Sequence, residues 1–351
     1  MRRRALLELA ALCSWGASAG AFGLGCSSGP SLVPIGGVDI DPSVIDKDPI
    51  ALLPSGVLLF GQVDLVALFQ TPIGSDISSL VQSLVPLGPQ AGFVPARDTT
   101  RSMLGVYAMQ GVDFCAVTQG RFDVEAIRAA ADARVAAPSG LPMVKSRYGQ
   151  FDLYTVGNIG FVLLTPNTLL SGNETGMRRA LDRLRYNRFS RSVPDWMIKL
   201  GETPGSSFVA AGDFGAVVQA APATPEQKPA FDPGPTGSAA EPVLEAAAAT
   251  FPFLSGLRAL RVLGNFLAPG LNFAGALTYA TNEKAQAGAD SLRHLSELAQ
   301  WANLLTTFGF GASIPPAQIA LAEKEVAFVQ PIDTAIARAF LGIVSNYVRR
   351  S

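Results

Sequence analysis

The chain has 351 residues, of which 48% are hydrophobic and 16% are charged, and its formal net charge at pH 7 is −1. This balance excludes the strongly basic field that recruits nucleic acid, and it excludes the acidic composition of a disordered chain. The length and the apolar fraction together predict a folded protein made of two domains or of one large domain.

The first 25 residues have the parts of an export signal. Arg2, Arg3 and Arg4 precede an apolar stretch that ends in small residues, which is the arrangement that a secretory signal peptide requires. We therefore predict that residues 1–25 are a signal peptide and that the protein is exported. An uncleaved membrane helix is the alternative, but Glu8 and the density of Gly and Ser are unlike the roughly 20 strongly apolar residues of a spanning helix.

The end of this segment resembles the lipobox of bacterial lipoproteins. Cys26 follows Gly25, as in that motif, whereas Leu24 stands one place later than the usual Leu. The resemblance implies that Cys26 is acylated and anchors the protein to a membrane, and Ser27 in the next position favours the outer membrane. Cleavage after small residues near Ala19 would instead release a periplasmic protein.

The rest of the chain divides into a tether and two halves. Residues 26–47 are rich in Gly, Pro, Ser and Asp, which predicts a flexible tether. We assign residues 48–202 to a first α+β half and residues 203–351 to a second. A Pro-rich insertion at 220–242 falls within the second half.

Strands and helices are predicted from alternation, from helical periodicity and from turn and cap residues. Asp123 is expected to cap one helix, and Gly157-Asn158 is a two-residue turn of the kind that hairpins prefer. The expected strands are 57–63, 103–109, 112–118, 150–156 and 160–164. The expected helices are 77–85, 124–135, 172–186, 194–200, 242–253 and 282–305.

Three pairs of segments recur in the same order and suggest an internal duplication. Residues 58–65 and 207–214 are both apolar strands that end in an Asp able to cap a helix. Residues 112–118 correspond to 271–279, and residues 159–165 to 325–329. We therefore predict two similar halves of mixed or antiparallel sheet packed with helices, each a β-α-β-β-β-α unit.

The sequence holds no recognisable catalytic, metal or cofactor motif, so we expect no catalytic residue, no metal and no cofactor. Cys115 lies in an apolar strand, which predicts a buried thiol. His294 is the only histidine and borders the apolar stripe of a helix, so it cannot make a zinc site by itself.

Six arginines concentrate in one segment near residues 177–191. Apolar residues spaced for a core-facing stripe lie among them, so the arginines are interpreted as the solvated face of a helix. The sharper hypothesis is contact with an anionic surface, because Arg binds phosphate in bidentate fashion. Its candidates are Arg178, Arg179 and Arg183.

Three functions stay open on this basis. The first is a non-enzymatic envelope lipoprotein that binds a protein, an envelope polymer or a lipid, with the membrane as partner through its lipid anchor and no nucleic acid. The second is a periplasmic carrier of an apolar ligand, with its cavity between curved strands and the helix at 282–305. The third is a hydrolase-type enzyme. The mature part also resembles uncharacterised two-halved exported bacterial proteins, at residues 54–64 and 284–287, which implies no known activity.

Overall fold

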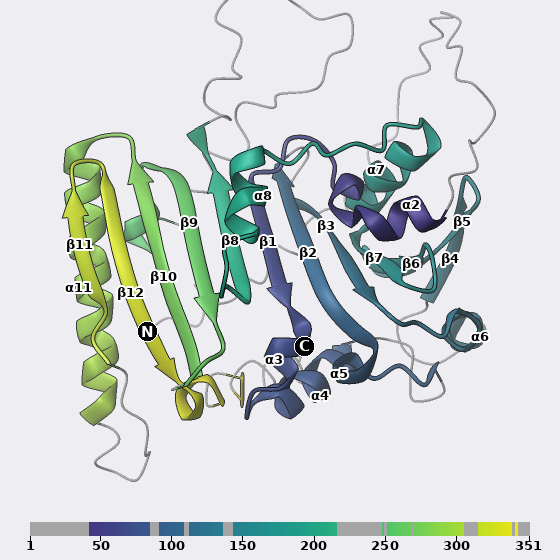
Figure 1. The fold of residues 1–351 in the computed structure, drawn as a ribbon, viewed down its shortest axis with the longest axis horizontal. Coiled ribbons are helices and arrows are strands. Elements are labelled where there is room, and N and C mark those ends of the chain that lie inside the picture. Colours follow the sequence, from purple (N-terminus) through teal and green to yellow (C-terminus); the bar gives the residue numbers. More distant parts are fainter. Residues whose placement is uncertain are drawn as a thin grey trace, which may run out of the picture.

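A computed structural model describes residues 42–84, 91–108, 112–135, 143–215, 248, 251–268, 270–304, 315–338 and 341–342. In these residues one antiparallel sheet of twelve strands runs through the molecule, in the order β11-β12-β10-β9-β8-β1-β2-β3-β7-β6-β5-β4 (Figure 1). The strands are β1 Leu59–Asp64, β2 Thr99–Ala108, β3 Val112–Gly120, β4 Met143–Tyr148, β5 Phe151–Val156, β6 Ile159–Leu163, β7 Thr168–Asn173, β8 Phe208–Asp213, β9 Leu257–Asn265, β10 Gly270–Tyr279, β11 Gln318–Ala322 and β12 Glu325–Asp333. The α+β class predicted from the sequence is confirmed.

Short helices join the strands, and one long helix lies in the second half. They are α2 Pro42–Lys47, η1 Pro49–Leu52, α3 Leu65–Phe69, α4 Gly74–Leu84, α5 Pro95–Asp98, α6 Val124–Val135, α7 Glu174–Arg185, α8 Asp195–Gly201, η3 Pro252–Leu254 and α11 Asn282–Leu304. Side-chain caps set several starts, since Asp64 accepts a hydrogen bond from the backbone N–H of Ala67 and Asp123 accepts one from Ala126. The predicted cap at Asp123 is therefore confirmed.

The sheet is built from two halves that mirror one another about its centre. β1 pairs with β8 there, and outward from that pair the order β1-β2-β3-β7-β6 is matched by β8-β9-β10-β12-β11. The helix after the first hairpin, α6, corresponds to α11. The predicted two-halved sheet is thus present, and both halves belong to one continuous sheet.

Two details of the predicted duplication are wrong. Residues 159–165 were matched with 325–329, but the neighbour of β3 is β7, and it is β7 that corresponds to β12. In both halves a helix separates the third strand from the hairpin that follows, α6 in the first half and α11 in the second, and the predicted unit β-α-β-β-β-α lacks this helix. In the first half the hairpin of β4 and β5 extends the sheet further.

The two faces of the sheet are packed differently. We call the face covered by α7 and α8 the front face; Met103, Val117 and Leu170 are fully buried on it. The opposite, back face carries α6 in the first half and α11 in the second, where Leu277 and Val326 are buried. Figure 1 shows α8 in front of the sheet and α11 behind β11 and β12.

The predicted tether extends too far into the fold. Its last six residues form α2, in which Ile45 is 3% exposed and belongs to the front-face core. Burial of one apolar side chain and the hydrogen bonds that Asp46 accepts from Thr165, Asn167 and Thr168 offset the entropy cost of ordering this segment. The signal peptide, Cys26 and the Pro-rich insertion 220–242 lie outside the described residues.

Candidate ligand-binding site

An apolar cavity of about 610 Å³ lies on the back face of the first half. Its walls come from β1, β2, β3, β5, β6 and β7 on one side and from α3, α4, α5 and α6 on the other. They include Leu65, Phe69, Phe122, Ile127 and Phe161. Cavities of about 300–1,000 Å³ with mostly apolar linings are typical of small-molecule sites.

The cavity exists because the floor of the sheet is made of small side chains at this point. Ser102 pairs with Thr118 across β2 and β3, and Ser171 of β7 lies opposite Phe161 of β6. On the front face of the same strands, large side chains fill the core completely. The small back-face residues leave the volume that large ones would have occupied.

The polar groups in the lining are largely satisfied by one another. The hydroxyls of Ser102 and Thr118 lie 3.0 Å apart and share a hydrogen bond, and Thr99 donates to the carbonyl of Pro95 at 2.7 Å. Because these hydroxyls already have hydrogen-bond partners, they need no hydrogen bond from a ligand. The cavity is therefore suited to an apolar occupant.

Aromatic rings and one exposed aliphatic side chain border the cavity. The rings of Tyr154 and Phe161 stack with centroids 5.3 Å apart, and Phe93 and Phe122 lie 6.3 Å apart. Ile159, which also lines the cavity, is 55% exposed. It follows Gly157-Asn158, the turn of the predicted hairpin, and Gly157 takes a positive φ of 62° that favours glycine.

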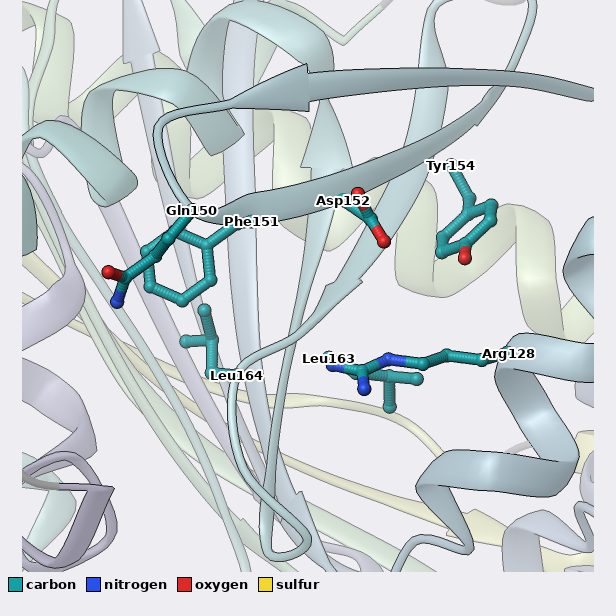
Figure 2. A pocket seen from close by; sticks show the side chains of 7 residues that line it. All are labelled: Arg128, Gln150, Phe151, Asp152, Tyr154, Leu163 and Leu164. Atoms are coloured by element: carbon teal, nitrogen blue, oxygen red, sulfur yellow. The ribbon is translucent and has the colours of Figure 1, made fainter.

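A smaller polar pocket of about 280 Å³ adjoins this site. Its lining is Arg128, Gln150, Phe151, Asp152, Tyr154, Leu163 and Leu164 (Figure 2). Figure 2 shows the side chain of Arg128 extended across the pocket. The side chains of Asp152 and Tyr154 point into the same pocket. Tyr154 lines both the cavity and the pocket.

A hydrogen-bonded cluster fixes the position of Tyr154. Its hydroxyl donates to Asp132 at 3.0 Å, and Lys145 lies 3.0 Å from Asp132 and 3.3 Å from Asp152. The hydrogen bond from Lys145 holds the pKa of Asp132 below its ordinary value, and the same contact raises the pKa of Lys145. Lys145 and the two acids together carry one net negative charge, and the positive charge of Arg128 also helps to lower the pKa of Asp132.

The three candidate arginines of α7 do not form one exposed surface. Arg183 donates to the carbonyls of Ala51 and Ser190 and to the hydroxyl of Ser192, and burial lowers its pKa from the ordinary value. Arg179 donates to the carbonyl of Ser55. Both side chains are half-buried and donate to neighbouring segments, so part of their hydrogen-bonding capacity is already used within the fold.

Arg178 differs from those two arginines. Its side chain is 44% exposed and forms an ion pair with Glu174 at 2.5 Å. The apolar stripe predicted for this helix is confirmed, since Met177, Ala180, Leu181 and Leu184 are all buried. Contact with an anionic surface stays a prediction for Arg178.

The other reactive side chains lie outside the cavity. Cys115 is fully buried in the front-face core, and burial raises the pKa of its thiol to about 12. The prediction of a buried thiol is confirmed. His294 is exposed on α11, 3.9 Å from Glu297, and lines neither the cavity nor the pocket.

Sequence reasoning missed this site. It expected a cavity beside the helix at 282–305, whereas the cavity lies in the first half under α3, α4, α5 and α6. One signal was available: Ser102, Thr118 and Ser171 are small polar residues that each stand beside an apolar residue, Met103, Val117 and Leu170. Their convergence depends on strand order, which periodicity does not reveal.

The fold and the site define an α+β protein with an apolar cavity of ligand size. Among solved structures the chain is similar to three crystal forms of TP0453. Form I has a TM-score of 0.46 and 11% identity, covering 85% of this chain and 96% of that chain. Form III has 0.44 and 10%, covering 88% and 99%, and form IV has 0.45 and 11%, covering 84% and 96%.

Similarity at this level indicates neither a ligand nor an activity. No family model and no curated protein matches the sequence. Within the part of the chain that the structure describes, no helix is both long enough and apolar enough to cross a membrane.

Proposed function

We propose that this protein is a non-enzymatic binding protein that holds an apolar ligand in the back-face cavity of its first half. The observation that carries the proposal is a cavity of about 610 Å³ whose lining is predominantly Leu, Val, Ile, Phe and Pro, with its hydroxyl groups largely paired. An alkyl chain fits this chemistry because it offers apolar surface and needs no hydrogen bonds.

The gain available to such a ligand is large enough for measurable binding. Each buried methylene contributes about 0.8 kcal/mol, so a chain of about twelve carbons gains roughly 9 kcal/mol. Lost translational and conformational freedom offsets part of this gain. If the lost freedom costs about 4 kcal/mol, about −5 kcal/mol remains, which corresponds to a dissociation constant of roughly 0.2 mM.

The experiment reduces the volume of the cavity by placing a larger side chain on the sheet that forms its floor. Replacing Ser171→Phe places a ring where the small side chain leaves space, so we expect at least a tenfold weaker affinity for the neutral dye N-phenyl-1-naphthylamine, measured by fluorescence titration. Ser79→Phe adds the same ring on the exposed side of α4 and is the matched control.

Equal dye affinity of wild type and Ser171→Phe would contradict the proposal, as would the absence of saturable binding in wild type. Circular dichroism and the unfolding midpoint of each variant establish that it is folded. Weak binding by a folded Ser171→Phe, with Ser79→Phe unchanged, supports occupation of the cavity.

We further propose that Cys26 anchors this binding protein in the cell envelope, with the outer membrane as its location. The support is the N-terminal sequence, in which Gly25-Cys26-Ser27 follows an apolar stretch. Intact mass spectrometry of protein recovered from membranes should give a chain that begins at Cys26 and carries acyl chains. A mature N-terminus upstream of Cys26 would favour a released periplasmic protein and contradict the anchor.

A further inference from the structure

The polar pocket adjoins the apolar cavity along three elements. On α6, Ile127 lines the cavity and Arg128 lines the pocket; on β6, Phe161 lines the cavity and Leu163 the pocket. Tyr154 of β5 belongs to both. A ligand that lies against Tyr154 in the cavity is therefore adjacent to the pocket.

Arg128 is the cation of this pocket, in the lining that the structure describes. Its ion pair is with Glu125 at 4.0 Å, and the Glu125 side chain is 92% exposed, so solvent screens this contact. Lys145, by contrast, lies between Asp132 and Asp152. The ion-pair partner of Arg128 is therefore more distant and more exposed than those of Lys145, although the charge of Arg128 also acts on Asp132.

Arg128 combines an apolar stem with a charged guanidinium head, as an amphiphilic ligand combines an alkyl chain with a polar head. Figure 2 shows its side chain extended across the pocket, with the guanidinium end nearest to Leu163 in this view. A guanidinium has five N–H donors arranged to bind a carboxylate or phosphate in bidentate fashion. A partly screened position favours such a group without the cost of full burial.

We propose that the ligand is an anionic amphiphile, with its alkyl chain in the apolar cavity and its carboxylate or phosphate head bound by Arg128 in the adjoining pocket. The proposal rests on the proposed apolar-ligand function and names the class of ligand. Asp152 lies in the same pocket, and its ion pair with Lys145 limits its repulsion of the head.

The experiment compares ligands that have the same twelve-carbon alkyl chain and different head groups. Dodecanoate and dodecanol are titrated separately against the purified full chain carrying N-phenyl-1-naphthylamine, below the micelle concentration and at fixed ionic strength. Wild type should bind dodecanoate about tenfold more tightly than dodecanol, because a charge-assisted hydrogen bond forms with Arg128. Arg128→Gln should lose that preference while its affinity for dodecanol stays unchanged.

Arg293→Gln is the matched control, because it removes an equal charge from a surface ion pair on α11. It should keep the preference for dodecanoate. Dodecyl phosphate in a parallel titration separates the two anionic heads, and stronger binding of either one by wild type than by Arg128→Gln supports the proposal.

The outcomes separate the two proposals. Equal affinities of wild type for dodecanol and both anionic amphiphiles would overturn the anionic head and leave the cavity proposal intact. A preference that persists in Arg128→Gln would overturn the role of Arg128. Failure of the dye and of all three amphiphiles to bind would overturn the cavity proposal as well.

Discussion

Asp46 shows how one carboxylate attaches a short N-terminal helix to the sheet. Thr165 and Thr168 each donate to it at 2.6 Å, and Asn167 donates at 3.0 Å. Both threonines are buried, so each would lack this charged acceptor if α2 left the fold. The turn between β6 and β7 is thereby tied to a segment more than a hundred residues earlier in the chain.

The same contact makes stability depend on pH. Burial raises the pKa of Asp46, but the hydrogen bonds from Thr165, Thr168 and Asn167 outweigh that effect and hold the pKa below 3.8. Because the folded-state pKa is depressed, the stabilisation is fully present above about pH 4 and is lost as the pH falls through the folded-state value.

We expect Asp46→Asn to lower the free energy of unfolding at pH 7 by about 1–2 kcal/mol, since an amide is a weaker acceptor than a carboxylate. The variant should also lose stability less steeply between about pH 4 and pH 2. Urea titrations at a series of pH values measure both effects. Asp290→Asn, in an exposed pair on α11, is the control; equal shifts in both variants would refute the role of Asp46.

At the scale of elements, α7 is positioned by its arginines as well as by its apolar stripe. Arg183 connects the helix to the carbonyl of Ala51 in η1 at 2.8 Å and to Ser192 at 2.8 Å. Arg179 lies over the ring of Tyr107, 4.8 Å from its centroid. A helical projection places Arg179 and Arg183 on the solvated face of α7, whereas in the fold both side chains contact neighbouring segments.

Replacing Arg183→Gln should lower the free energy of unfolding by about 1.5–3 kcal/mol, because hydrogen bonds from a charged group are lost, one of them to the carbonyl of the buried residue Ala51. Arg178→Gln removes an exposed ion pair and should change it by less than about 1 kcal/mol. Urea unfolding followed by circular dichroism measures both. Equal losses in the two variants would show that Arg183 has no special structural role.

Element prediction succeeded where the signal was local. The helix at 124–135 agrees with α6 in both bounds, because Asp123 caps it and alanines dominate it. β7 was missed: Thr168–Asn173 contains Ser, Gly and Asn, and its end was assigned to the start of α7. Its strand conformation comes from pairing with β3 and β6 on both sides, which outweighs weak propensity.

At the scale of the whole molecule, two related halves share one sheet and differ in what covers it. The back face carries a helix in each half, α6 and α11, while α7 covers the front face of the first half. In the second half, Ala320, Ala327 and Val329 are exposed on that front face. The segment after β12 instead sends Arg338 to Asp76 of α4, at 2.9 Å, which links the second half to the first.

The sequence by itself determined the features that neighbouring residues control: the α+β class, the hairpin at Gly157-Asn158, the cap at Asp123 and the apolar stripe of α7. Tertiary structure decided the cavity, because its floor joins Ser102, Thr118 and Ser171 from three strands. It also decided that Arg183 turns inward and that Arg128 faces a pocket. Side-chain spacing fixes the face of one element, whereas strand order and helix placement fix what that face meets.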